Sequence, residues 1–330
     1  MNSPERTMDR KAVSLPICRT LLSLITLLLL AGRCTAPKET AKEPVKPVVE
    51  VEPVKPTVAL VLGGGAARGF AHVGVLRVLA QEKIPIDMII GTSVGSLIGA
   101  IYASHCNTFE LEWTAFKLEK DDIFDFSIFK SATGPVKGDK LEKFVSTEID
   151  AGKIEHLKVP FYAVAADLNT GEPVVFSRGS IAKAVRASCS IPGVFTPLEL
   201  DGRQLIDGGV LGNIAPEVAR RHGANFVIVV SIGKAIQNLE TTNVVNITMQ
   251  AISIMSSRID HFKVKQADVL IAPEVGDVGM MDFSRKKYCM KEGIKAAREA
   301  VPEIKRKLEA FGKPQEVAVD SAAIDMKSEE

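Results

Sequence analysis

The chain has 330 residues, 46% of them hydrophobic and 25% charged, which is enough to bury one large domain and to leave residues for appendages. A formal net charge of +1 and an aromatic content of 5% argue against a basic or base-stacking surface, so we predict no nucleic-acid partner. The five cysteines are too few for a disulfide framework in a chain of this length.

Residues 1–36 have the pattern of an export signal. Basic residues precede an apolar run at 21–32, which is too short to span a bilayer comfortably as a mature helix. Residues 29–34 (LLAGRC) resemble a bacterial lipoprotein box that would be lipidated at Cys34, with Arg33 where that pattern has a small residue. A cleaved export signal and an uncleaved anchor are the alternatives. All three place the domain outside the cytoplasm, either as a membrane-anchored lipoprotein or as a secreted protein.

A proline-rich segment follows at residues 37–56, where five prolines alternate with Lys, Glu and Val. This composition favours extended polyproline II and would reach about 60 Å at about 3.1 Å per residue. We predict a tether between membrane and domain, the alternative being a linker without that role. The predicted domain comprises residues 57–312, and residues 313–330, acidic and without apolar periodicity, are predicted to be a disordered tail.

Within residues 57–312, short β-branched runs alternate with helical patterns. Strands are expected at residues 57–62, 87–90, 159–165, 174–176, 226–232 and 269–272. Helices are expected at residues 70–82, 94–104, 139–149, 181–188, 244–262 and 286–308. Continuous apolar strands bracketed by helices predict an α/β fold with a largely parallel sheet that is covered on both faces.

A glycine-rich loop, residues 63–69 (GGGAARG), follows the first expected strand and opens a helix. Glycines there let the backbone approach a ligand and direct N–H groups at negative charge. The loop could hold an oxyanion, cradle a dinucleotide pyrophosphate or be a tight turn. The dinucleotide fingerprint matches poorly, because Ala66 and Arg68 stand where a glycine is required and no acidic strand end follows about twenty residues on.

The pentapeptide Gly91-Thr92-Ser93-Val94-Gly95 stands at the junction of an expected strand and an expected helix. Glycines two residues before and two after the serine relieve crowding in the sharp turn that lifts its hydroxyl above the sheet. The pattern alone is a moderate signal, and the strand–turn–helix context strengthens it. It indicates Ser93 as a nucleophile, with the helix N-terminus favouring the alkoxide and the oxyanion.

The tripeptide Asp207-Gly208-Gly209 is expected on a short loop after residues 204–206. By itself it is a common turn. It gains weight because a serine hydroxyl needs a base, and none of the five histidines stands in a loop after a late strand, where a histidine base is expected. His72, just inside the helix expected at 70–82, is predicted to be structural.

Together these motifs resemble the patatin-like phospholipase family. The resemblance covers about residues 58–212, where the glycine loop, the pentapeptide, residues 187–195 (ASCSIPGVF) and the Asp207 turn occur in the family's order. Many members carry glycine where Ala66 stands, and a backbone donor tolerates alanine there if φ stays negative. The resemblance implies a three-layer α/β/α sandwich with a mostly parallel central sheet, in a bacterial protein with a single patatin domain behind its export signal.

The resemblance also implies a Ser–Asp dyad without histidine, in which Ser93 is the nucleophile and Asp207 the base. The N–H groups of Gly64 and Gly65 would be oxyanion donors, with Arg68 supporting that loop. The remaining predicted site residues are Gly63 of the oxyanion loop, Gly91, Thr92, Val94 and Gly95 of the nucleophile elbow, and Gly208 and Gly209 of the base loop. An aspartate with an ordinary pKa near 3.9 is a weak base, so the mechanism needs a partly desolvated carboxylate.

The predicted function is that of a serine-dependent lipid acyl hydrolase of the phospholipase A, lysophospholipase or esterase type. Its substrate would be a phospholipid or another acyl-ester lipid at a membrane surface, and no cofactor or metal is predicted, since clustered carboxylates for calcium are not apparent. Residues 123–129 (IFDFSIF) could line an acyl pocket, contact lipid or pack in the core. The alternatives are a catalytically silent protein that binds lipid or a partner, and a nucleotide-binding α/β protein, for which a ribose-binding acid is missing.

Overall fold

The computed structural model describes residues 48–51, 54–125, 136–233, 244–311 and 315–318. It divides into two units, residues 50–315 and residues 1–49 with 316–330. Strands β1 (Val48–Val51) and β10 (Gln315–Ala318) pair as a two-stranded sheet and fall in the ranges predicted as tether and tail. The predicted export segment with Cys34 lies outside the described residues. No helix in the described ranges is long and apolar enough to cross a membrane.

The larger unit is built on a mixed sheet, which has eight strands in the described part of the chain. These strands are β2 (Val58–Leu62), β3 (Met88–Thr92), β4 (Phe161–Asp167), β5 (Pro173–Phe176), β6 (Leu198–Leu200), β7 (Arg203–Asp207), β8 (Phe226–Val230) and β9 (Val269–Ile271). The order β4-β3-β2-β8-β9 is parallel throughout, and β5, β7 and β6 extend the β4 side by antiparallel pairing. Every residue of β2, β3 and β8 is buried, which is why these strands are continuous apolar runs.

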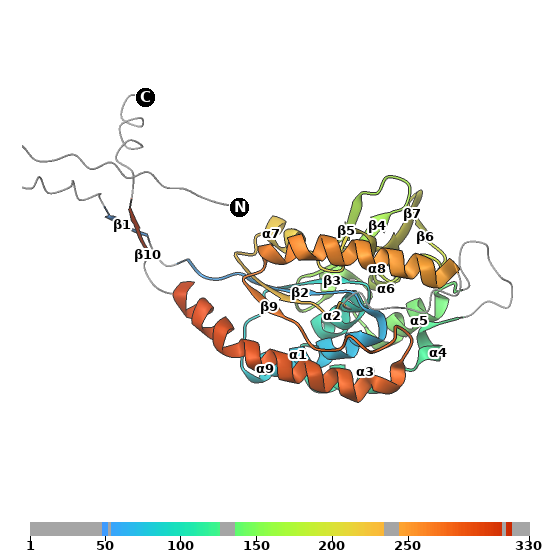
Figure 1. The fold of residues 1–330 in the computed structure, drawn as a ribbon, viewed down its shortest axis with the longest axis horizontal. Helices are drawn as coiled ribbons and strands as arrows, with labels where there is room; N and C mark the ends of the chain where they lie inside the picture. The colour runs from blue at the N-terminus through green and yellow to red at the C-terminus, as the bar shows by residue number, and fades with distance from the viewer. Residues whose placement is uncertain (1–47, 52–53, 126–135, 234–243, 312–314, 319–330) are drawn as a thin grey trace, which may run out of the picture. The chain divides into compact units, whose positions relative to one another are not determined.

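Helices cover both faces of this sheet, with α7 and α8 above it and α1, α3 and α9 below it in Figure 1. The helices are α1 (Phe70–Gln81), α2 (Val94–His105), α3 (Thr108–Lys117), α4 (Lys120–Ile123), α5 (Asp139–Glu148), α6 (Ile181–Ser188), α7 (Pro216–Arg221), α8 (Val244–Lys263) and α9 (Lys286–Phe311). Short 3₁₀ turns are η1 (Ala66–Gly69), η2 (Ile154–His156), η3 (Gly208–Leu211), η4 (Val264–Gln266) and η5 (Phe283–Arg285). The predicted α/β fold with a sheet covered on both sides is confirmed.

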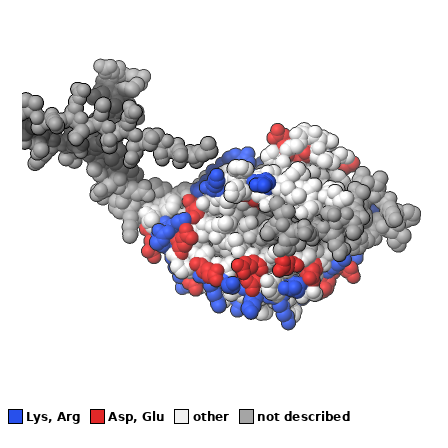
Figure 2. Space-filling view, in the orientation of Figure 1, with Lys and Arg blue, Asp and Glu red and all other residues white. Residues whose placement is uncertain are grey.

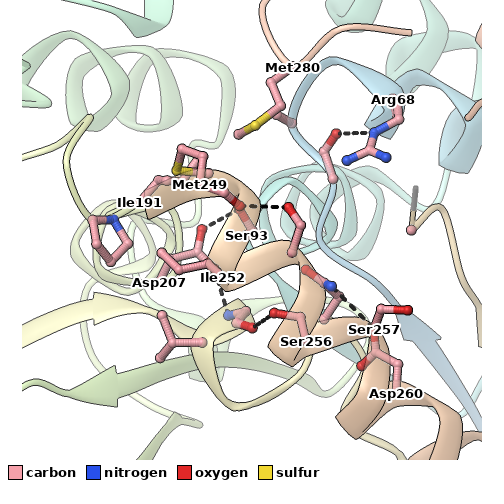
Figure 3. Close-up of a pocket in the computed structure, with 18 of the residues that line it drawn as sticks. Arg68, Ser93, Ile191, Asp207, Met249, Ile252, Ser256, Ser257, Asp260 and Met280 are labelled. Atoms are coloured by element: carbon pink, nitrogen blue, oxygen red, sulfur yellow. Dashed lines mark hydrogen bonds between the residues drawn. The ribbon is translucent and has the colours of Figure 1, made fainter. Parts of the chain in front are cut away.

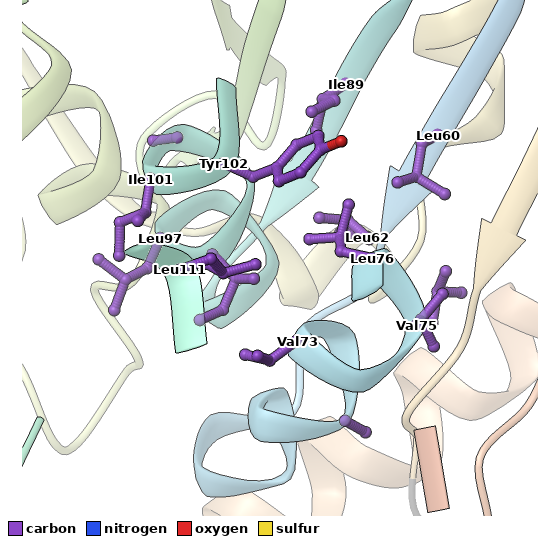
Figure 4. Close-up of a cluster of buried hydrophobic side chains, with 14 of the residues drawn as sticks. Leu60, Leu62, Val73, Val75, Leu76, Ile89, Leu97, Ile101, Tyr102 and Leu111 are labelled. Carbon is purple, nitrogen blue, oxygen red and sulfur yellow. The ribbon is translucent and has the colours of Figure 1, made fainter. Parts of the chain in front are cut away.

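The apolar core lies in two layers, one on each face of the sheet. Leu60 and Leu62 of β2 belong to the layer that contains Leu76 of α1, as Figure 4 shows. The alternate residues of β2 belong to the other layer, where they pack with buried side chains of α7. This alternation is the two-residue period of a strand whose faces are both covered. Packing on both faces holds the central strands in place, and the carboxyl ends of β2 and β3 lead into the glycine-rich loop and the turn that contains Ser93.

All the strands and helices expected from the sequence are present, with small shifts at their ends. The sequence patterns do not indicate α3, α4, α7, β6 or β7. The expectation of a loop for Asp207 is wrong, because this residue ends β7, which pairs with β4 and β6. The strand is short and begins with the polar pair Arg203 and Gln204, so it lacks the apolar run by which the central strands are recognised.

Candidate active site

Ser93 lies in the turn between β3 and α2, with φ 54° and ψ −128°. A residue with a Cβ in this region stores about 1–3 kcal/mol of strain, so the surrounding structure must hold it in place. The glycines two residues before and after Ser93 allow the backbone of α2 to approach the strand ends closely. A Cβ on Gly95 would lie 2.1 Å from the Leu62 carbonyl oxygen, and one on Gly91 would lie 2.4 Å from Ser96 Cα. Only glycine at these two positions lets α2 start directly against the strand ends.

Two buried serines fix the strained backbone of Ser93. The Ser93 N–H donates to Ser188 Oγ at 2.8 Å, and Ser188 Oγ donates in turn to the carbonyl of Val164 at 2.6 Å. On the other side of the turn, Ser96 Oγ donates to the Ser93 carbonyl at 2.6 Å. Both serines are fully buried. Ser188 stands within the motif at residues 187–195, but the pattern does not tell which residue its hydroxyl contacts.

We expect Ser188→Ala to lower kcat for a soluble ester by about tenfold or more, because Ser93 loses the acceptor that holds its backbone N–H. The measurement is steady-state kinetics together with the free energy of unfolding, which should fall by about 1–3 kcal/mol. Ser180→Ala is the matched control, since Ser180 caps the other end of α6 by accepting from the Lys183 N–H. This control should lose about 1 kcal/mol of stability and retain its kcat. Equal kcat in both variants would show that Ser188 is merely structural.

The Ser93 side chain faces Asp207, and its Oγ donates to Asp207 Oδ2 at 2.5 Å. The other carboxylate oxygen, Oδ1, accepts from the Gly209 N–H at 2.7 Å. The neighbouring glycine is also constrained, since a Cβ on Gly208 would lie 2.5 Å from the Val164 carbonyl oxygen. Asp207 is 5% exposed, and burial raises its pKa to about 6, against the lowering effect of these two hydrogen bonds. The carboxylate is therefore ionised at neutral pH and more basic than an exposed aspartate, as a Ser–Asp dyad requires.

The glycine-rich loop lies at the carboxyl end of β2, and two of its N–H groups are already bonded. Gly63 donates to the Val230 carbonyl and Gly64 to the Asn213 carbonyl, each at 3.0 Å. Gly65 and Ala66 both line the cavity at Ser93, and their N–H groups have no acceptor among the described residues. Of the two N–H groups predicted as oxyanion donors, that of Gly64 is therefore already bonded, whereas those of Gly65 and its neighbour Ala66 are open to the cavity.

Ala66 adopts a left-handed conformation with φ 52°, so the condition under which alanine is tolerated without strain, a negative φ, is not met. Residues with a Cβ lose about 1–2 kcal/mol in this region, whereas glycine does not. We expect Ala66→Gly to raise the free energy of unfolding by about 1 kcal/mol and to preserve activity. Ala67→Gly, at a neighbour whose φ is not positive, should destabilise the protein instead. Denaturant unfolding of the two variants checks both signs; a loss of stability in Ala66→Gly would contradict the strain argument.

Two buried side chains, those of His72 and Arg68, support the glycine loop from within. His72 is fully buried, and its Nε2 lies 2.8 Å from the Gly63 carbonyl oxygen. Burial lowers the pKa of His72 to about 4, so the imidazole is neutral and its Nε2–H donates to Gly63. Arg68 Nε donates to the Gly65 carbonyl at 3.1 Å, and burial lowers the pKa of this guanidinium to about 10. Both side chains therefore position the loop, and His72 does not face the serine as a base.

Two cavities meet at Ser93, which lines both together with Ala66, Ile191 and Met280. The larger, of about 290 Å³, has a polar wall, and Figure 3 shows Ser256, Ser257 and Asp260 beside the dyad. Its further polar lining residues are Arg68, Asp207, Asn213, Ser231 and Ser253. The smaller, of about 50 Å³, is apolar and is lined by Phe70, Val94, Leu97, Ile98, Leu118, Ile123, Phe124, Leu141, Phe195 and Phe283, among others. The first residues of the aromatic segment at 123–129 thus line a cavity; those from 126 onward lie outside the described residues.

The remaining predicted site residue, Thr92, ends β3 and is fully buried. Within the residues that the structure describes, no group of three or more His, Cys, Asp or Glu side chains is placed to hold a metal ion. The site that the fold brings together therefore consists of a serine, a buried carboxylate, a glycine loop and two cavities of opposite polarity. A serine hydroxyl bonded to a buried carboxylate beside open backbone N–H groups is an arrangement in which nucleophilic attack on an acyl group is chemically feasible.

Comparison with known proteins identifies the family of this site. Residues 60–220 match the family model of the patatin-like phospholipases, and the chain contains a patatin-like phospholipase domain, as predicted. It is 37% identical over 179 residues to an uncharacterized NTE family protein of Mycobacterium tuberculosis, covering 54% of this chain and 49% of that protein. It is 35% identical over 183 residues to patatin-like phospholipase domain-containing protein 6 of Homo sapiens, covering 54% of this chain and 13% of that protein.

The alignment thus spans about half the length of the mycobacterial relative and a smaller share of the human one. Among solved structures, VipD from Legionella pneumophila is similar, with a TM-score of 0.53 and 14% identity. That similarity covers 84% of this chain and 71% of the VipD chain. At this identity the similarity concerns the fold alone, and it agrees with the α/β architecture described above.

Proposed function

We propose that this protein is a serine-dependent lipid acyl hydrolase, a carboxylic ester hydrolase of the phospholipase A, lysophospholipase or esterase type. The observation that carries the proposal is the 2.5 Å hydrogen bond from Ser93 Oγ to the buried Asp207, at the point where the two cavities meet. The patatin-like phospholipase domain at residues 60–220 supports an acyl ester as the substrate.

In the proposed mechanism, Ser93 Oγ attacks the ester carbonyl carbon while Asp207 takes the hydroxyl proton. The negative charge that forms on the carbonyl oxygen is stabilised by the N–H groups of Gly65 and Ala66, each contributing about 3–4 kcal/mol if well placed. The protonated Asp207 then gives its proton to the departing alcohol, leaving an acyl group on Ser93. Water attacks this acyl-enzyme while Asp207 takes its proton, and Asp207 returns that proton to Ser93 Oγ as the carboxylic acid is released.

The two cavities differ in polarity, as do the acyl chain and the alcohol part of an ester lipid. We assign the acyl chain to the apolar cavity, where it exchanges water for aromatic and aliphatic side chains. The alcohol part of the lipid goes to the polar cavity, where serine hydroxyls and the amide of Asn213 can replace its hydrogen bonds with water. The ester carbonyl then lies between them, at Ser93.

We further propose that residues 1–36 export the protein, that residues 37–56 tether the domain of residues 57–312 to a membrane, that residues 313–330 form a tail outside that domain, and that Cys34 carries the lipid. The lipoprotein-like residues 29–34 and the prolines at 37–56 support this proposal. Metabolic labelling with a radioactive fatty acid tests it. Label that persists in Cys34→Ser would contradict lipidation at that residue and would leave the hydrolase proposal untouched.

The hydrolase proposal is tested with the full chain and a phospholipid in detergent micelles, with released fatty acid measured by mass spectrometry. We expect fatty acid from wild type and none above background from Ser93→Ala. If the wild-type protein bound the lipid without releasing fatty acid, it would instead be a catalytically silent lipid-binding protein.

A further inference from the structure

Helix α8 runs along the polar cavity and has two unlike faces. The face toward the cavity carries Ser253, Ser256, Ser257 and Asp260, together with Met249 and Ile252. The opposite side carries four exposed apolar side chains: Ile247 (52% exposed), Ile254 (40%), Met255 (54%) and Phe262 (67%). Positions seven or eight residues apart recur on the same side of an α-helix, so these four residues form a single stripe. We call this stripe, with Arg258 between its members, the outer face of α8.

The polarity of α8 is reversed relative to an ordinary surface helix, which turns its apolar stripe toward the core. Here serine hydroxyls and a carboxylate face inward, and large apolar side chains face outward. In Figure 2, red and blue side chains alternate along the lower edge of the molecule, where α9 lies. A contiguous exposed apolar stripe of this kind marks an interaction surface.

The charged side chains that α8 and the residues just after it expose beside this stripe are Arg258 and Lys265. Arg258, His261 and Lys265 are exposed beside the stripe, and Lys265 Nζ lies 5.6 Å from the Phe262 ring centroid. Between residues 247 and 266 the single carboxylate is Asp260, and it faces the cavity. An exposed apolar stripe flanked by cations is the pattern of a helix that lies in the interface of an anionic lipid surface.

We propose that the outer face of α8 docks on an anionic lipid surface and brings the polar cavity to the membrane. The inference rests on the proposed function, because a lipid that leaves the membrane must reach the cavity that the inner face of α8 lines. Apolar side chains would enter the headgroup–acyl boundary, and Arg258 and Lys265 would contact lipid phosphates. Docking by α8 is independent of any attachment through residues 1–56.

A second exposed apolar stripe lies on α3 and differs in its charges. Phe109, Trp113 and Phe116 are exposed, but the same helix carries Glu110 and Glu112, which would be repelled by anionic lipid. Trp113 is the only tryptophan of the chain, so its fluorescence reports on α3 and not on α8.

The test uses the full chain and vesicles of phosphatidylcholine with or without phosphatidylglycerol. Its variant is the double change Ile254→Glu and Met255→Glu, and its matched control is Phe109→Glu with Leu270→Glu, which adds the same charge at two exposed apolar side chains on other elements. We expect the α8 variant to lower the vesicle-bound fraction and the rate of vesicle lipid hydrolysis by about tenfold or more, with the control close to wild type. All variants keep residues 1–56, so attachment there is common to every arm.

Three further readouts keep the proposal distinct from the hydrolase proposal. Hydrolysis of a soluble p-nitrophenyl ester should be unchanged in the α8 variant, since residues 254 and 255 do not line either cavity. Wild type should bind more strongly to vesicles that contain phosphatidylglycerol than to vesicles without it. Adding vesicles should not shift the emission wavelength of Trp113. Docking through α8 would be overturned if the α8 variant bound vesicles as well as wild type does. It would also be overturned if vesicles shifted the Trp113 emission of wild type to the blue and the control variant lost that shift. A protein that binds through α8 without hydrolysing any ester would leave docking intact and refute the hydrolase instead.

Discussion

Ser93→Ala is expected to lower kcat for a soluble p-nitrophenyl ester by about 10⁴-fold or more, because no acyl-enzyme can form without the hydroxyl. The fold should persist, since the hydrogen bond to Ser188 comes from the backbone N–H of residue 93 and not from its side chain. Steady-state kinetics measure the loss of kcat, and a thermal melt of the same sample measures whether the fold persists.

Ser253→Ala is the matched control for this substitution. Ser253 also lines the polar cavity, but its hydroxyl donates to the carbonyl of Met249 within the same helix, at 2.8 Å. We expect its kcat to stay within about threefold of wild type. A Ser93→Ala protein that hydrolysed the ester as fast as Ser253→Ala would remove Ser93 from the mechanism.

Asp207→Asn is expected to have opposite effects on activity and stability. The folded-state pKa of Asp207 is raised from 3.8 to about 6, so below pH of about 4 the carboxyl is protonated in both folded and unfolded chains and has no pH-dependent cost. Between about pH 4 and pH 6 the unfolded chain loses this proton while the folded chain keeps it, so stability falls by about 3 kcal/mol, at about 1.4 kcal/mol per pKa unit, and then levels off. Asparagine avoids this loss.

The variant should therefore match wild type in free energy of unfolding at pH 4 and exceed it by up to about 3 kcal/mol at pH 8. At the same time kcat should fall by about 10³-fold or more, because an amide cannot accept the serine proton.

In wild type, kcat/KM should rise with pH through about 6 and then level off. Urea unfolding at the two pH values and a pH–rate profile supply these data. The turn variant Asp201→Asn, at an exposed aspartate, should keep wild-type kcat. A pH-independent stability difference would contradict the buried, ionised Asp207.

The central fold was predictable because its parallel strands are continuous apolar runs and the helices between them are periodic. The elements that were not predicted are short or lack a clear apolar period. Helix α7 has only six residues, and α3 exposes Phe109 and Trp113, which blurs the apolar period by which a helix is recognised. The antiparallel edge strands are short and partly polar, and they are held by pairing with β4 rather than by burial of both faces.

The residues of the candidate site were indicated by the sequence, but their hydrogen-bond partners were not. The N–H of Gly64 is taken by the Asn213 carbonyl, and the N–H of Ser93 by the hydroxyl of Ser188; both pairs are distant along the chain. The positive φ of Ala66 was likewise not indicated by the sequence, because alanine itself gives no signal for it. The spacing of motifs therefore locates the chemistry, whereas the choice of donors depends on the packed loops.

The most direct test of the account is covalent capture of the nucleophile. The full-length protein is treated with a fluorophosphonate, digested and analysed by mass spectrometry. We expect one phosphonyl adduct, on the peptide that contains Ser93; it should be absent from Ser93→Ala and form far more slowly in Asp207→Asn. An adduct on another residue, or none in a protein that still hydrolyses esters, would contradict the Ser93–Asp207 dyad.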